Sequence, residues 1–379
     1  MDFRYSDEQL ELRTGVRRLL GDIASDDAVR AAMDTEQGWD TKAYRRLAEE
    51  LGVVGLAVPE ELGGSGGGLM ELGVVLQEAG RALLPAPLLA CAIAARAVLE
   101  SGDAATAARV LPGIAAGTTV ATLAAMEGSG WDDAVSTTAS EGASGWTVTG
   151  TKPWVIDAQS ADLLVVSATS DAGLSLFLVD SSSPGVAVTP VAGVDLTRRQ
   201  GTVVLTDVPT VPLGVPGSGA GPLARTLDVA VVLLAAEQLG VAERCLEMAT
   251  DYAKDRRQFG RAIGSFQAIK HKLANVLLEV EAARSAVMYA LWTADHDAAE
   301  LPVVAAIAGS TCSETALLAA GENIQVHGGI GCTWEHPAHL YLKRATTDRL
   351  LFGDPQRHLA RLADHLDERP PGHLVSVSR

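Results

Sequence analysis

The first third of the chain has a helical pattern of hydrophobic and polar positions. Apolar residues recur every three or four positions from Leu10 through Val16 to Leu20, which predicts an amphipathic helix with one face in a core. Ser6 precedes two acidic residues, an arrangement typical of a helix N-cap and first turn. Strand signals are nearly absent as far as about residue 115. We therefore expect an α-helical domain over residues 1–116.

A glycine-rich segment at residues 61–68 interrupts this pattern, before another long helix that we predict over residues 69–83. Glycines of this density are typical of a loop. The sequence leaves open whether the loop is only a connection or forms the edge of a ligand site.

The pattern changes to short β-branched runs between residues 117 and 217. Runs such as DLLVVSA, LSLFLVD and GTVVLTDV are separated by Gly, Ser, Asp and Pro, which predicts a small β domain. Helical periodicity returns after a Gly- and Pro-rich stretch and defines a third domain over residues 218–379. Its predicted helices cover residues 223–256, 265–297, 302–325 and 337–351.

Composition narrows the possible classes of protein. The 379 residues carry a formal net charge of −17, which opposes binding to nucleic acid or to an anionic membrane surface. The four cysteines include no CxxC pair, so we expect neither a metal site nor a disulfide framework, and we assign the protein to the cytoplasm. The N-terminus is charged from Asp2 and the longest apolar stretch is residues 229–236, so we expect no signal peptide and no membrane span.

Common catalytic and nucleotide-binding motifs are missing from the sequence. It contains no GxGxxG after a strand, no GxxxxGK[ST], no HExxH and no GxSxG. Four local segments remain as candidates for a ligand site, and their order along the chain matters more than any one alone.

The first candidate is the turn between two predicted helices, DRRQFGRAIGSFQAIKHKLA at residues 255–274. Arg256 and its basic neighbours offer donors suited to a pyrophosphate or a carboxylate. Taken alone, they equally fit a solvated helix end. Phe259 and Phe266 would by default be core residues.

The second candidate is the segment QVHGGIG, with Gln325, Gly328 and Gly329. Glycines allow a close backbone approach to a planar or phosphorylated ligand, and the Gln325 amide both donates and accepts. Without further context the segment equally fits a helix C-cap and tight turn.

Both segments, with the N-terminal MDFRYSDEQLELR and the later GLAVPEELGGSGGG, resemble acyl-CoA dehydrogenases in the same order along the chain. The resemblance implies an α+β fold with an N-terminal helical domain, a middle antiparallel β domain and a C-terminal four-helix bundle. It also implies FAD as cofactor and pairing into homodimers or tetramers. The FAD-binding residues carried over by the resemblance are Arg256, Gln258, Phe259, Phe266, Gln325, Gly328 and Gly329.

The β domain matches this family less closely. Residues 123–134 stand where the family has a flavin and substrate loop, of which only Glu127, the glycines and Asp132 are retained. Trp154, in GTKPWVID, corresponds to a flavin-contacting Trp, or is a strand-core aromatic. The hydroxyl residue that follows it in the family is replaced by Ile156.

The carboxylate that removes the substrate α-proton in this family is displaced here. Gly353 occupies the position of the usual Glu, and its backbone N–H would polarise the thioester carbonyl. Asp354 follows one residue later and is either the base or the cap of a helix beginning at Pro355. Glu237 and Asp228, on the first helix of the third domain, are alternatives, as is a base supplied by a partner subunit.

The resemblance thus implies FAD-dependent α,β-desaturation of an acyl-CoA or related acyl thioester, with electrons passed to an electron-transfer flavoprotein or similar acceptor. Two alternatives stay open. One is a non-catalytic subunit that completes the flavin site of a heteromer with a homologous chain. The other is a flavin oxidase of the same superfamily.

Overall fold

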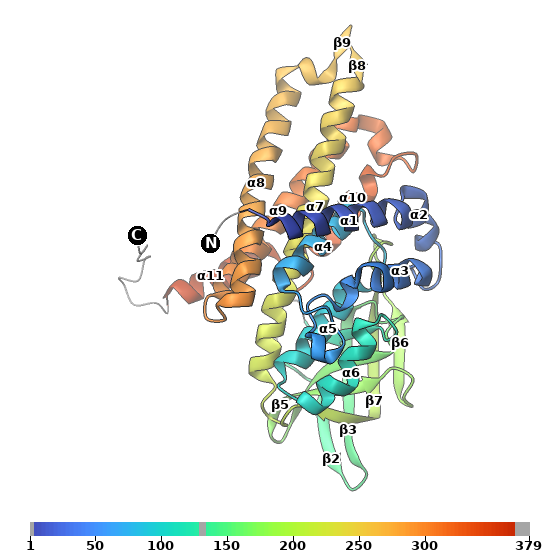
Figure 1. Ribbon diagram of the computed structural model, residues 1–379, viewed down its shortest axis with the longest axis vertical. Coiled ribbons are helices and arrows are strands. Elements are labelled where there is room, and N and C mark those ends of the chain that lie inside the picture. Colours follow the sequence, from blue (N-terminus) through green and yellow to red (C-terminus); the bar gives the residue numbers. More distant parts are fainter. Residues whose placement is uncertain (1–3, 129–133, 368–379) are drawn as a thin grey trace.

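The computed structural model describes residues 4–128 and 134–367. It has three regions, with helices first, a sheet second and long helices last (Figure 1). The helices of the first region are α1 Asp7–Ile23, α2 Asp26–Met33, α3 Thr41–Leu51, α4 Leu69–Arg81, α5 Leu88–Glu100 and α6 Ala104–Ala115.

Local sequence sets where these helices begin. The Ser6 hydroxyl accepts from the Gln9 backbone N–H at 3.2 Å while the Gln9 side chain accepts from the Ser6 N–H, which completes a capping box for α1. The predicted N-cap is confirmed. Of the glycine-rich residues 61–68, the first two end a short 3₁₀ turn, Glu60–Leu62, and the other six connect this turn to α4.

The middle region is a sheet of seven strands. Six of them follow the order β1-β4-β2-β3-β7-β5, and the seventh, β6, pairs with β7. The strands are β1 Ala121–Ala124, β2 Thr138–Gly142, β3 Gly145–Ile156, β4 Leu163–Ser170, β5 Gly173–Asp180, β6 Val186–Pro190 and β7 Gln200–Leu213.

Most strand pairs are antiparallel, as expected, but β1 and β4 run parallel. β2 also pairs with β4 in parallel, through Thr138 and Thr169. The Asp162 carboxylate accepts from the Val120 N–H at 2.8 Å, and the Asp162 N–H donates to the Val120 carbonyl at 2.8 Å. These two bonds hold the starts of β1 and β4 side by side and so set the parallel pair.

The last region contains α7 Ala220–Asp255, α8 Gln267–His296, α9 Leu301–His327, α10 Ala338–Asp348 and α11 Pro355–Asp367. Their bounds follow the predicted helices within a few residues. The expected four-helix bundle is supplemented by α11, so this region has five helices among the described residues. The small hairpin β8 Arg257–Gln258 and β9 Arg261–Ala262 joins α7 to α8 at the end remote from the sheet (Figure 1).

The long helix α7 connects all three regions. It packs against α4, α8 and α9 and is buried along most of its length, from Leu223 to Ala253. Of the described helices, α9 with its following turn, Leu301–Cys332, is long and apolar enough to span a membrane, but 61% of its most apolar window is buried inside the fold. A core helix of a folded domain meets the same criteria.

Candidate active site

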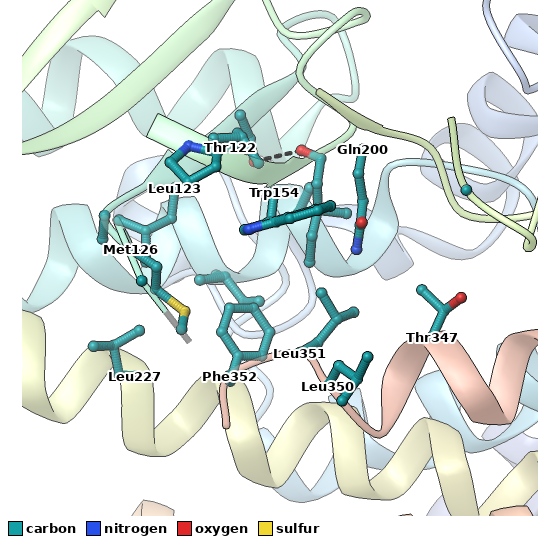
Figure 2. Close-up of a pocket in the computed structure, with 18 of the residues that line it drawn as sticks. Thr122, Leu123, Met126, Trp154, Gln200, Leu227, Thr347, Leu350, Leu351 and Phe352 are labelled. Carbon is teal, nitrogen blue, oxygen red and sulfur yellow. Dashed lines mark hydrogen bonds between the residues drawn. The ribbon is translucent and has the colours of Figure 1, made fainter. Parts of the chain in front are cut away.

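A cavity of about 550 Å³ lies where the sheet, α5, α7 and the end of α10 meet. Its described walls are mostly apolar. In Figure 2, Trp154 lies across the cavity opposite Leu350, Leu351 and Phe352, and Gln200 and Thr347 stand at one side. A volume and lining of this kind are typical of a site for a cofactor or small molecule.

Trp154 projects into this cavity from an irregular part of β3. The pairing of β3 with β7 shifts register between Lys152 and Val155, and Trp154 has a positive φ of 59°. Such conformations are uncommon for a large residue and cluster at functional sites. The Trp154 side chain is 55% exposed, so it is not a strand-core aromatic but a ring available to a ligand.

Beside Trp154, a buried ion pair holds the segment that lines the cavity at Ala125, Met126 and Gly128. The Lys152 ammonium donates to the Glu127 carboxylate at 2.6 Å and to the Ala125 carbonyl at 3.3 Å. Burial lowers the pKa of Lys152 to about 8 although Glu127 opposes the shift. Burial acts to raise the pKa of Glu127, but hydrogen bonds from Lys152 and from residues 136 and 137 outweigh it and hold this pKa at about 2. The pair therefore stays ionised and fixes this wall.

Sequence reasoning missed Lys152. It lies four residues after the buried Val148 on β3, and both side chains are buried. Because residues alternate between the two faces of a strand, a period of two would have placed this lysine inside, where it needs an anionic partner.

Asp354 lines the cavity and also caps α11. Its Oδ1 accepts from the Arg357 N–H at 2.9 Å, and the Asp354 carbonyl accepts from the His358 N–H at 3.1 Å. The capping role is thus present. Asp354 is the one carboxylate among the described residues that line the cavity, so the geometry also leaves it available to act on a ligand.

Gly353 has a backbone that favours glycine. Its φ is 105°, and a Cβ added there would contact the imidazole of His358 at 3.5 Å. A glutamate at this position would therefore be strained. The cavity contacts Phe352 and Asp354 on either side of Gly353.

The two alternative bases on α7 are engaged elsewhere. The Glu237 carboxylate is buried between the guanidinium groups of Arg198 and Arg344, which keep its pKa low against the effect of burial. The Asp228 carboxylate pairs with Arg361. Neither acid is among the residues that line the cavity. A carboxylate held ionised between two arginines is a poor proton acceptor.

The predicted flavin residues of the β8–β9 hairpin lie at the opposite end of α7. Arg256, Gln258 and Phe259 are exposed there, and Phe259 is 92% exposed, so its default assignment to the core is wrong. The hairpin is too small to cover this ring, which contacts Phe266 edge-on at 6.2 Å between centroids. The Arg261 guanidinium covers the Phe266 ring at 3.9 Å.

Gln325, Gly328 and Gly329 end α9 beside the same hairpin, and all three are exposed. The His327 ring stacks on Tyr252 of α7 with centroids 4.3 Å apart, which joins this segment to the last turns of α7. The structure thus brings both predicted motifs together in one surface.

This surface and the cavity are separate within one chain. Leu227 lines the cavity and Asp255 precedes the hairpin, 28 residues further along α7. At about 1.5 Å per residue, the two lie roughly 42 Å apart. A single chain therefore cannot bring Trp154 and Arg256 to one end of a cofactor, whereas a second chain could present its hairpin to the cavity of the first.

The residues present fit FAD in two parts. The apolar cavity and the half-exposed Trp154 ring suit a planar ring system, although Ile156 provides no hydroxyl. The exposed arginines and glycines of the remote surface suit a pyrophosphate. Among the described residues, the cavity itself contains no Lys or Arg that would bind the phosphates.

Comparison with known proteins identifies the family. Residues 6–118, 121–208 and 217–366 match the N-terminal, middle and C-terminal domains of acyl-CoA dehydrogenase, respectively. The chain is 39% identical to the acyl-CoA dehydrogenase IpdE2 of Mycobacterium tuberculosis over 364 residues, which are 96% of this chain and 99% of the relative. It is 36% identical to the IpdE2 of Mycolicibacterium smegmatis, over 94% and 98% of the two chains.

Two solved structures extend the match to three dimensions. A variant of the steroid ACAD Tcur3481-Tcur3483 superposes with a TM-score of 0.88 at 36% identity, over 96% of this chain and 98% of the other. The ChsE4-ChsE5 complex of Mycobacterium tuberculosis superposes with a TM-score of 0.90 at 29% identity, over 98% and 100%. The chain therefore belongs to the acyl-CoA dehydrogenase family and is an oxidoreductase of that kind.

Proposed function

We propose that this chain binds FAD and catalyses the α,β-desaturation of an acyl-CoA or related acyl thioester, with Asp354 as the base. The observation that carries the proposal is the position of Asp354 in the wall of an apolar cavity that also exposes Trp154. Members of the family are flavoproteins, which agrees with this assignment.

The carboxylate would act while it still caps α11. With Oδ1 engaged by the Arg357 N–H, the substrate α-proton would be taken by Oδ2. Bound FAD would supply the electron sink that accepts the β-hydrogen as hydride. The apolar walls from Met126, Leu227 and Phe352 exclude water and hold the acyl group, and the electrons would pass to a separate electron-transfer flavoprotein or similar acceptor.

The flavin site would be completed by a second subunit. Because the hairpin and the cavity lie at opposite ends of α7, a partner must supply Arg256, Gln258 and Phe259, with Gln325 and the glycines that follow it. A homodimer or tetramer would provide this arrangement, as would a heteromer with a homologous chain.

Gly353 supports a second candidate function. A turn whose backbone disfavours a side chain at the expected position of the base fits a subunit that completes a flavin site without catalysing the reaction. The ChsE4-ChsE5 complex, similar to this chain, contains two differently named subunits. In this case the homologous partner would carry the base.

The test is a titration of the purified apo-protein with FAD, followed by flavin absorbance and by Trp fluorescence. Wild type is expected to turn yellow and to lose part of its Trp fluorescence, and Trp154→Phe is expected to weaken FAD binding. Trp292→Phe is the matched control, because Trp292 is not among the residues that line the cavity and lies near the end of α8, whereas the β8–β9 hairpin precedes the start of this helix. A chain that is colourless after incubation with excess FAD and removal of the unbound FAD would refute the proposed function.

A further inference from the structure

The loop between β6 and β7 reaches from the sheet to the C-terminal helices beside the cavity. Gly193 and Val194 in this loop line the cavity, and Gln200, the first residue of β7, does so too. The next residues of the loop point the other way, since Asp195 and Thr197 are 4% exposed. The loop is thus exposed on its cavity side and anchored on its inner side.

The anchor is the guanidinium group of Arg344, on α10. Its Nε donates to the Asp195 carboxylate at 2.9 Å and to the Thr197 hydroxyl at 3.1 Å. Its Nη2 donates to the Thr197 carbonyl at 2.8 Å and to the same hydroxyl at 2.6 Å. The Thr197 hydroxyl in turn donates to Asp195 at 2.6 Å. One planar cation therefore holds both ends of a three-residue segment, a task that suits a guanidinium fork.

Two buried acids connect this anchor to the helices. Glu237 of α7 accepts from both Arg344 and Arg198, and Arg198 also pairs with Asp348 of α10 at 3.1 Å. All these side chains are at most 8% exposed. We call this set the junction cluster, which consists of Asp195, Thr197, Arg198, Glu237, Arg344 and Asp348.

Both walls of the cavity adjoin the junction cluster. Thr346 and Thr347 line the cavity and lie between Arg344 and Asp348 on α10, while Gly193 and Val194 come just before Asp195. Figure 2 shows Gln200 and Thr347 on the same side of the cavity as one end of Trp154. A shift of the loop relative to α10 would therefore change the width of the cavity beside that ring.

We propose that Arg344 and Thr197 are positioning residues, which fix the distance between the β6–β7 loop and α10 and thereby shape the cavity for FAD beside Trp154. This inference rests on the proposed function. The competing explanation is that the junction cluster only stabilises the contact between two domains. The two explanations differ in what they predict for a folded variant that has lost one hydroxyl group.

Thr197→Val removes the hydroxyl that accepts two Arg344 bonds but keeps the shape of the side chain and the backbone carbonyl. We expect the dissociation constant for FAD to rise about tenfold, because two buried guanidinium N–H groups lose an acceptor and the loop shifts. Thr197→Ser keeps the hydroxyl and is expected to restore the dissociation constant to within about twofold of wild type. Arg344→Lys is expected to raise the dissociation constant for FAD as Thr197→Val does, since an ammonium group cannot reproduce the two-pronged hydrogen bonding of a guanidinium.

The matched control is Thr210→Val. The Thr210 hydroxyl donates to the Leu178 carbonyl at 2.7 Å within the sheet, away from the junction cluster. Its loss tests the general effect of removing a hydroxyl group and is expected to leave FAD affinity unchanged.

The experiment is an FAD titration of each full-length apo-protein, at a temperature where circular dichroism shows every variant to be folded. Equal FAD affinity of wild type and a folded Thr197→Val, or failure of Thr197→Ser to restore it, would overturn the inference and leave only a stabilising role. A wild type that binds no FAD would overturn the proposed function, and the inference with it.

Discussion

The strongest consequence of the site geometry concerns Asp354, which caps α11 and, in the proposed function, is also the base, so that substitution can separate the two roles. Asn keeps a side-chain oxygen able to accept from the Arg357 N–H, now bonded at 2.9 Å, but it cannot take a proton. Asp354→Asn should therefore change the free energy of unfolding by only a few tenths of a kcal/mol, whereas Asp354→Ala should cost about 1 kcal/mol through the lost cap.

The rate of the reaction, unlike the stability, should fall equally in both variants. Loss of a general base lowers the rate of proton abstraction by roughly 10²–10⁴-fold, so both Asp354→Asn and Asp354→Ala should reduce bound flavin at least about a hundredfold more slowly than wild type. The control is Asp40→Ala, because Asp40 caps α3 through the Lys42 N–H at 2.8 Å and lies outside the cavity. It should lose stability and keep the rate of flavin reduction.

The assay is anaerobic stopped-flow bleaching of the flavin by an acyl thioester, with urea unfolding of the same preparations. Wild-type rates in Asp354→Asn would refute the assignment of the base to Asp354 and would favour a base from a partner subunit. Slow bleaching together with a loss of stability equal to that of Asp354→Ala would show that Asp354 matters only as a cap.

Three further substitutions test residues that adjoin the walls of the cavity in the sequence. Lys152→Met leaves Glu127 without its buried cation and should cost about 3–5 kcal/mol in thermal or urea unfolding, with weaker FAD binding. Gly353→Glu introduces the carboxylate that the family resemblance leads us to expect at this position, but it should lose about 1–3 kcal/mol to backbone strain at φ 105°, with no faster flavin bleaching. Burial raises the pKa of Asp157 from 3.8 to about 6, so ionised Asp157 costs stability as the pH rises through this interval. Asp157→Asn should thus exceed wild type by up to about 3 kcal/mol in urea unfolding at pH 8, and the gain should shrink as the pH falls toward 4.

Much of the fold could be predicted from the sequence because its signals are local. The capping box at Ser6 and the long periodic runs of the C-terminal helices depend on residues a few positions apart. The parallel pairing of β1 with β4 could not be predicted in this way. It depends on the contact between Asp162 and Val120, 42 residues apart, which no local pattern records.

Residues of the candidate site could be predicted only where a short sequence motif contains them. Trp154 and Asp354 were predicted as site residues from short segments, and both line the cavity. Arg344 was not predicted, because its partners Asp195 and Glu237 are 149 and 107 residues away in the sequence. From the sequence alone, each of these charged residues is expected on a solvated surface, because charged side chains are rarely buried. Only the packing of the domains brings them together.

The measurement that tests the central claim most directly is anaerobic addition of an acyl-CoA panel to the FAD-loaded wild-type protein, followed by the flavin absorbance. A steroid-derived acyl-CoA belongs in the panel, since a steroid ACAD is 36% identical to this chain. Bleaching of the flavin by at least one thioester is the predicted result. A yellow protein that no thioester bleaches would contradict a catalytic role for this chain and would favour the non-catalytic partner subunit.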